Sequence, residues 1–205
     1  MTIHTPNTTK GHVCLIEDHA DLRADLLRLL QASGYTVKDY PSAIEYLQTE
    51  QAQFEGVIVS DMVMPEMSGL ELQTALASRG ILLPFIFISG ESSDRQIISA
   101  MKNRAFDFLL KPFGKNELLD AIDRALAFGE QEKESREHKK DLEHGLSLLS
   151  PREREVFFLL TRGFNNQEIV RNLRISLPTA KQYKAEVMRK LGASSLSALM
   201  ALANT

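Results

Sequence analysis

The chain has few cysteines and no long apolar run. Its one cysteine, Cys14, lies in the apolar run Val13 to Ile16. It excludes an internal disulfide, and its position favours a small buried hydrophobe over a reactive thiol. No apolar run approaches the roughly 20 residues that cross a bilayer. The polar first ten residues lack the apolar segment of a secretory signal. We therefore expect a cytoplasmic protein without membrane contacts.

Positive charge is scarce in the first part of the chain and in excess in the last part. Residues 1–127 hold 11 Lys and Arg against 17 Asp and Glu, a net charge of −6. Residues 128–149 hold 4 against 6 (net −2), and residues 150–205 hold 9 against 4 (net +5). The length of 205 residues allows two small domains. An acidic part followed by a basic part indicates two domains, the second with an anionic partner.

Short apolar runs alternate with helical patterns through the first part of the chain. The runs predict strands at 12–16, 35–40, 56–60, 85–88 and 106–110. Apolar spacing and capping residues predict five helices. The first contains Leu22 to Leu30 and ends before Gly34, the second is short and opens at Ser42, two lie at about 68–78 and 93–102, and the last contains Leu118 to Leu126. Five strands alternating with five helices predict an α/β domain with a parallel, doubly wound sheet of five strands.

Polar side chains stand where several predicted strands end. The buried strand before Asp61 ends at that carboxylate, and Pro65 and Gly69 then turn the chain into a helix. Alone, Asp61 is typical of a turn. However, other strands also end in polar residues, namely Glu17 and Asp18, Ser89, and Lys111. In a doubly wound sheet these ends face one crevice, so the side chains would converge.

Three converging carboxylates repel one another unless a cation lies among them. Hard oxygen ligands in an open site suit Mg²⁺, and Lys111 would aim a second positive charge at an incoming anion. This set favours a site where Asp61, as nucleophile, takes up a phosphoryl group. An alternative to the phosphoryl site is that these residues are only structural, with Asp18 and Lys111 forming a solvated ion pair and Ser89 capping the end of its strand. The coincidence of five such residues favours the phosphoryl site.

Residues 10–127 resemble the receiver domain of two-component response regulators. The resemblance rests on Glu17-Asp18, the run from Asp61 to Leu70, Ser89, and Lys111-Pro112-Phe113. It implies a flavodoxin-like fold and transfer of a phosphoryl group from a sensor histidine kinase to Asp61. Arg104 stands where many relatives carry glycine, which would strain a turn that needs positive φ.

The resemblance also implies roles for the residues around Asp61. Mg²⁺ would be bound by Asp18, Asp61 and the Val63 carbonyl, with Glu17 acting through water. Lys111 and Ser89 would hold the phosphoryl oxygens. Phe108 would be the switch aromatic that swings inward on activation, although an aromatic on a buried strand is also typical of a core residue.

Residues 128–146 form a charged segment rich in helix formers. Opposite charges at i and i+4, such as Glu132 with Arg136, support a helix. Two interpretations stay open: a solvated helical spacer, or a continuation of the preceding helix that transmits a change in domain arrangement.

Residues 147–205 contain four predicted helices with short connections. Ser150, Asn165 and Ser176 stand at capping positions of the first three helices. Gly163 and Gly192 end the first and the third. Two short helices joined by a tight turn, within a basic unit, predict a small all-α helix-turn-helix domain that binds DNA.

The third helix of this part, at about 177–191, has a packed side and a basic side. Solvation alone would account for a basic side, but the helix-turn-helix context favours DNA. Residues 147–205 resemble the LuxR-type helix-turn-helix, and the whole chain resembles the FixJ/NarL class of response regulators. The resemblance places Lys181 and Gln182 near bases and the last helix in a dimer contact. The candidate DNA-binding residues are Thr179, Lys181, Gln182, Lys184, Ala185 and Arg189.

These patterns predict a phosphorylation-controlled transcriptional regulator. Phosphorylation at Asp61 would shift the face following Ser89 toward a receiver homodimer, pairing two basic domains on two half-sites of double-stranded DNA. One alternative is a signalling adaptor that works through protein contacts, which absent or salt-insensitive DNA binding would favour. Another is an enzyme at the Mg²⁺ site, but the sequence offers no catalytic set beyond self-phosphorylation and dephosphorylation.

Overall fold

Five strands pair in parallel in the order β2-β1-β3-β4-β5. The computed structural model describes residues 9–49, 54–90 and 105–203. The strands are β1 (His12–Ile16), β2 (Thr36–Tyr40), β3 (Val57–Asp61), β4 (Phe85–Ser89) and β5 (Asp107–Leu110). The predicted helix at 93–102 and Arg104 lie outside the described residues. The predicted parallel α/β sheet is confirmed.

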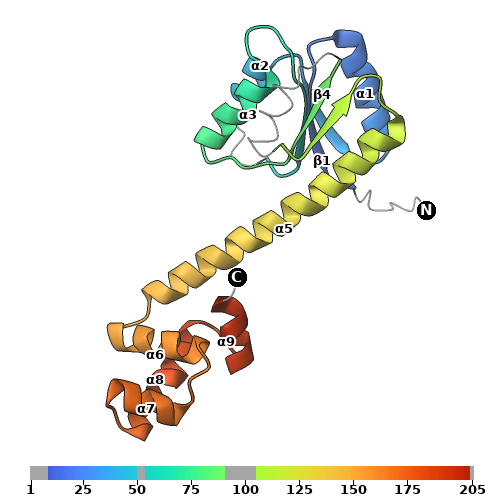
Figure 1. Ribbon diagram of the computed structural model, residues 1–205. Helices are drawn as coiled ribbons and strands as arrows, with labels where there is room; N and C mark the ends of the chain where they lie inside the picture. Colours follow the sequence, from blue (N-terminus) through green and yellow to red (C-terminus); the bar gives the residue numbers. More distant parts are fainter. Residues whose placement is uncertain (1–8, 50–53, 91–104, 204–205) are drawn as a thin grey trace, which may run out of the picture. The chain divides into compact units, whose positions relative to one another are not determined.

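Alternating side chains of the strands are buried on both faces of the sheet. In β3, Val57 and Val59 belong to one apolar cluster and Ile58 to the other, as the period of two requires. The first cluster includes α1 (Ala20–Ala32) and the start of α5 (Lys115–Ser147), and the second includes α2 (Ala43–Leu47) and α3 (Gly69–Ser78). Figure 1 shows these helix pairs on opposite sides of the sheet.

The strand order reverses between β1 and β3. From β1 the chain passes to β2 on one side, and later returns to β3 on the other. Ile16 at the end of β1 lies in register with Ser60, next to the end of β3. Ligands of open α/β sheets bind outside the carboxyl ends of the strands at such a reversal. The residues that follow β1 and end β3 are Glu17, Asp18 and Asp61.

The charged segment at 128–146 is helical and lies within α5, which continues the last helix of the first part. The chain divides into two units between Gln131 and Glu132, inside this helix. Near its start α5 buries Leu118 and Ile122 against the sheet, and near its end Leu142 packs in the second unit. Most side chains at 130–141 are exposed. Whether the helix transmits a change in domain arrangement stays a prediction.

The second unit is all-α, as predicted. After the end of α5 it contains α6 (Pro151–Thr161), α7 (Asn166–Leu173), α8 (Leu177–Lys190) and α9 (Leu196–Ala203). Ser150 with Glu153 and Asn165 with Glu168 form reciprocal capping boxes, and Ser176 accepts a hydrogen bond from the Thr179 N–H. The unit has its own apolar core, which includes Leu149, Val156, Phe157, Leu160, Ile169, Ala180, Val187 and Leu199.

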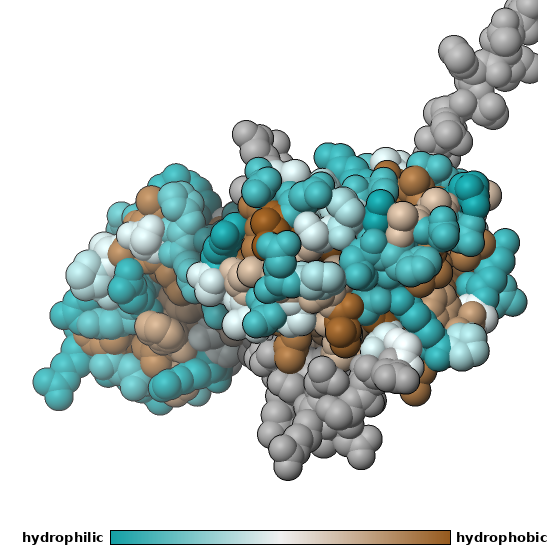
Figure 2. Space-filling model, turned by 90° about the horizontal axis from the view of Figure 1, so that it is seen from above, coloured by the Kyte–Doolittle hydropathy of each residue, from teal (hydrophilic) through white to brown (hydrophobic). Residues whose placement is uncertain are grey.

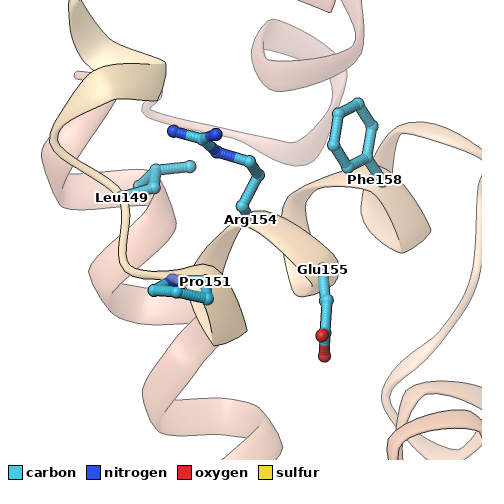
Figure 3. A pocket seen from close by; sticks show the side chains of 5 residues that line it. All are labelled: Leu149, Pro151, Arg154, Glu155 and Phe158. Atoms are coloured by element: carbon cyan, nitrogen blue, oxygen red, sulfur yellow. The ribbon is translucent and has the colours of Figure 1, made fainter.

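Seven large apolar side chains of the described residues are exposed. They are Val63, Leu82, Leu110, Phe128, Leu148, Phe158 and Leu177. On the face seen in Figure 2, hydrophobic patches are interspersed with hydrophilic residues. Within the described ranges, no helix is long and apolar enough to cross a membrane. A pocket of about 310 Å³ beside α6 is lined by Leu149, Pro151, Arg154, Glu155 and Phe158, and none of the predicted site residues lines it (Figure 3).

Candidate functional site

Asp61 is held at both of its carboxylate oxygens. It is the last residue of β3 and is 8% exposed. The backbone N–H of Val63 donates to Oδ1 at 2.9 Å, and Lys111 Nζ donates to Oδ2 at 2.5 Å. The first bond comes from the turn that follows β3, and the second comes from the residue after β5. The carboxylate is therefore fixed in orientation at the mouth of the crevice.

Gly69 allows the helix after Asp61 to begin close to the end of β3. A Cβ at this position would lie 2.4 Å from the Asp61 carbonyl oxygen and 2.9 Å from Ser60 Oγ. The Gly69 N–H donates to the Met62 carbonyl at 3.2 Å. Any larger residue would push the helix start away from the strand, so the glycine is part of what positions Asp61.

Two further carboxylates come from the turn after β1. Glu17 is 1% exposed; its Oε2 accepts a hydrogen bond from Lys111 at 2.9 Å, and its Oε1 accepts one from the His19 N–H at 3.3 Å. Asp18 is exposed. One oxygen each of Glu17, Asp18 and Asp61 lie within 4.8 Å of one another. The structure thus brings the three predicted metal-binding carboxylates together.

Lys111 bridges two of these carboxylates. Burial by itself would lower the pKa of Lys111, but the hydrogen bonds to Asp61 and Glu17 outweigh it and raise that pKa, so the ammonium is charged at neutral pH. Burial raises the pKa of Glu17, and the hydrogen bond from Lys111 opposes this shift. With all four groups ionised, three carboxylates and one ammonium leave a local charge of −2. An all-oxygen donor set with this charge fits a hard divalent cation.

Ser89 and Phe108 lie on neighbouring strands beside the cluster. Ser89 ends β4 and is 1% exposed, and its carbonyl accepts a hydrogen bond from the Lys111 N–H at 2.8 Å. Phe108 is partly buried on β5, pairs in register with Phe87 and packs against the apolar cluster on the α2–α3 side. The structure therefore places Ser89 next to the residue that holds Asp61. The partial burial of Phe108 is compatible with both interpretations of this aromatic.

The third helix of the second unit, α8, separates its buried and exposed residues as predicted. Ala180 and Val187 are fully buried. The candidate DNA contacts Lys181, Gln182, Ala185 and Arg189 are exposed, and Thr179 and Lys184 are half-buried. Arg189 forms an ion pair with Glu186 at 2.7 Å, so its guanidinium is partly neutralised.

The end of α8 is tied to the start of α6 by a partly buried ion pair. Lys190 Nζ lies 2.7 Å from Glu153 Oε2 and donates to the Leu148 carbonyl at 3.2 Å. The same Glu153 oxygen accepts a hydrogen bond from the Ser150 N–H at 2.7 Å. Hydrogen bonds from Lys190 and from the Ser150 N–H lower the pKa of Glu153. Glu153, which belongs to the capping box of α6, thus also holds the end of α8 in place.

Comparison with known proteins agrees with both parts of this structure. The family described as response regulator receiver domain matches residues 13–123, and the family described as bacterial regulatory proteins of the luxR type matches residues 147–203. The transcriptional regulatory protein FixJ of Bradyrhizobium diazoefficiens is 36% identical, over 96% of this chain and 96% of its own length. The chain belongs to the FixJ/NarL class of response regulators.

Other relatives of this response regulator match nearly its whole length. Nodulation protein W of the same organism is 36% identical over 98% of this chain and 89% of its own. The solved structure of the response regulator StyR has a TM-score of 0.79 at 33% identity, covering 95% of this chain and 98% of that one. Full-length FixJ from B. japonicum has a TM-score of 0.62 at 36% identity, covering 96% and 97%.

The response regulator is a phosphorylation-controlled, DNA-binding transcriptional regulator. Its family is one of transcription regulators and not of enzymes in the usual sense. The relatives favour this function over the adaptor that uses no DNA. The first unit is hereafter the receiver unit, and the second is the DNA-binding unit.

Sequence reasoning did not find several residues of the response regulator that support the site. Arg23, on α1, donates to the Glu17 carbonyl at 2.7 Å and forms an ion pair with Asp39 at 3.3 Å. His19 caps α1 and binds Glu17 through its N–H. Neither residue forms a spacing pattern that stands out, because the contacts depend on how the turn after β1 folds. The signal for the Ser68–Glu71 capping box was present, since Ser-x-x-Glu precedes an apolar run.

Proposed function

We propose that Asp61 is the phosphoacceptor of this response regulator and that its phosphorylation promotes dimerisation and DNA binding. The observation that supports this is the geometry of the Asp61 carboxylate. It ends a strand at the crevice, has an ammonium 2.5 Å from one oxygen, and lies beside two further carboxylates. A carboxylate held this way is oriented for attack and has a cation ready for the charge of an incoming phosphoryl group.

In the proposed reaction, an Asp61 oxygen attacks the phosphorus of a phosphohistidine on the sensor kinase. A bond forms between that oxygen and phosphorus, and the phosphorus–nitrogen bond breaks with its electron pair left on the histidine. Lys111 Nζ, already within 2.5 Å of Asp61 Oδ2, neutralises the phosphoryl oxygens, and the Ser89 hydroxyl donates a hydrogen bond to one of them. Hydrolysis of the acyl phosphate returns Asp61 to its carboxylate, which is the only catalysis we assign to the chain.

Mg²⁺ is the cofactor that the donor set suits. Asp18, Asp61 and the Val63 carbonyl would hold it, and Glu17 would act through water. When bound, the cation supplies charge neutralisation for the phosphoryl oxygens. Glu17 is the least exposed of the three carboxylates and is already engaged by Lys111, which suits an indirect role.

Phosphorylation reaches the DNA-binding unit through the residues beside Asp61 in this proposal. Ser89 moves toward the phosphoryl group, and Phe108, on the strand paired with β4, turns inward. The face that follows Ser89 then supports a homodimer; part of that face lies outside the described residues. Two DNA-binding units are thereby paired on two half-sites. On each, Lys181, Gln182 and Ala185 face base edges, while Thr179, Lys184 and Arg189 contact phosphates.

Treatment with acetyl phosphate and Mg²⁺ tests the assignment of Asp61. We expect intact-mass spectrometry to find one added phosphoryl group per chain and peptide mapping to place it on Asp61. Asp61→Asn abolishes the addition and the accompanying shift to dimer in sedimentation. Asp25→Asn is the matched control, because Asp25 is an exposed carboxylate on α1 paired with Arg28. An Asp61→Asn protein that still gains the phosphoryl group and dimerises would overturn the proposal.

A further inference from the structure

Leu177 is a large apolar side chain exposed at the start of α8. It is the first residue of that helix and is 41% exposed. Nearby apolar residues such as Leu173 and Ile175 pack against the core of the DNA-binding unit, whereas Leu177 is not among the residues that do. Ser176, just before it, caps the helix through the Thr179 N–H. The backbone around Leu177 is therefore fixed while its side chain is partly exposed to solvent.

Leu177 lies on the same side of α8 as Lys181 and Lys184, two of the basic candidate residues. Residues four positions apart are neighbours on a helix, about 40° apart around its axis, so Leu177 is one turn before Lys181. Lys184, a further turn along, lies about 20° from Leu177 on its other side. Side chains on a helix lean toward its N-terminus. Leu177 therefore extends the surface of Lys181 toward the N-terminal end of the helix.

That end of the helix has a distinct part in the proposed function. In helix-turn-helix proteins, the N-terminal residues of the recognition helix contact base edges in the major groove. An apolar side chain there cannot pair with a hydrogen-bonding group of a base. The apolar group that the major groove offers is the 5-methyl group of thymine.

We propose that Leu177 contacts the 5-methyl group of a thymine in each half-site and so contributes to operator specificity. This inference rests on the proposed DNA binding through α8. A single exposed leucine is by itself ordinary. Leu177 differs from the other two exposed large apolar side chains among the described residues of this unit, Leu148 and Phe158, because they lie outside α8. The contact would cover the exposed part of the Leu177 side chain. Removing this apolar surface from water favours binding.

Replacing thymine by uracil tests this contact without changing the protein. A duplex is first selected from a random library with the full chain, treated with acetyl phosphate and Mg²⁺. Each thymine is then replaced singly by deoxyuridine, which removes only the methyl group. We expect one replacement per half-site to raise the Kd about fourfold, the effect of exposing one methyl group at ~0.8 kcal/mol. In Leu177→Ala, we expect the same replacement to change the Kd by no more than about 1.5-fold.

Two variants separate this contact from a general change in the unit. Leu177→Met keeps an apolar group at the position and is expected to retain the uracil penalty. Leu148→Ala is the matched control, because Leu148 is also an exposed leucine, at 52%, but lies outside α8; it leaves the penalty unchanged. A penalty that persists in Leu177→Ala, or a selected duplex in which every thymine methyl is dispensable, overturns the inference. Failure to select any duplex would overturn the proposed DNA binding itself.

Discussion

Removing the ammonium of Lys190 is expected to loosen the DNA-binding unit. Lys190 Nζ is 2.7 Å from Glu153 Oε2, and the side chains are 24% and 8% exposed. Lys190→Met keeps most of the aliphatic stem but leaves the Glu153 carboxylate with only its hydrogen bonds from Ser150. Hydrogen bonds to charged groups contribute about 1.5–3 kcal/mol. Because Lys190 is partly solvated, we expect a loss near the lower end, about 2 kcal/mol.

Hydrogen exchange of the full chain, followed by mass spectrometry, measures this loss of stability separately for each helix of the DNA-binding unit. A loss of about 2 kcal/mol corresponds to roughly 30-fold faster exchange in α6 and α8. Peptides from β1 and β3 of the receiver unit are the internal control and are expected to exchange as in the wild type. Glu153→Gln and the double variant complete a double-mutant cycle, for which we expect a coupling of about 1.5 kcal/mol.

The pH dependence of this coupling follows from the lowered pKa of Glu153. Its carboxyl group has an ordinary pKa of 4.5, and in the folded unit Lys190 and the Ser150 N–H lower that pKa. Between the two values the unfolded chain binds more protons than the folded one, so stability rises with pH. The stability that the ionised Glu153 contributes is therefore complete above pH 4.5, and it is lost as the pH falls through the folded-state pKa. If the losses of stability caused by Lys190→Met and by Glu153→Gln add within about 0.5 kcal/mol in the double variant at pH 7, the reasoning is refuted.

Three further predictions concern the two sites. Gly69→Ala places a Cβ 2.4 Å from the Asp61 carbonyl, so we expect a loss of about 1–3 kcal/mol in urea unfolding and slower phosphorylation; unchanged stability would contradict this. Glu17→Gln is expected to raise stability at pH 7 without Mg²⁺, because burial raises the pKa of Glu17 and ionisation in the folded state then lowers stability as the pH rises. Thermal melts at pH 4 and 7 check the sign. Lys184→Ala is expected to lower the salt slope of DNA binding by about 1, because this lysine is assigned to a phosphate. Arg189→Ala is expected to lower it by less, because the Glu186 carboxylate already pairs with Arg189.

The strands and most helix ends could be predicted because their signals are local. The β-branched run at 57–59 and the alternation of its side chains between two cores follow from the sequence pattern alone. Ser150 and Asn165 cap their helices through the residue three positions later, which the pattern names directly. Two turns were less predictable, because Glu66 and Arg174 adopt positive φ angles of 65° and 53° that sequence rules assign to glycine.

The contacts of the site depend on residues far apart in the chain. Lys111 binds Asp61 and Glu17 across 50 and 94 positions, and only the strand order brings these residues to one crevice. The sequence predicts their convergence through the rule for strand ends, but not which oxygen each nitrogen meets. The continuity of α5 through Gly129 does not follow from the sequence pattern either. Glycine weakens a helix by only about 1 kcal/mol, so its neighbours decide.

The central claim is that phosphorylation of Asp61 controls DNA binding, and one measurement tests it most directly. The Kd for a selected two-half-site duplex is measured with and without acetyl phosphate, at fixed salt and Mg²⁺, for the wild type and for Asp61→Asn. We predict that the phosphodonor tightens binding at least tenfold for the wild type, a coupling of about 1.4 kcal/mol. It leaves Asp61→Asn unchanged. Equal tightening of both proteins, or of neither, would contradict the account.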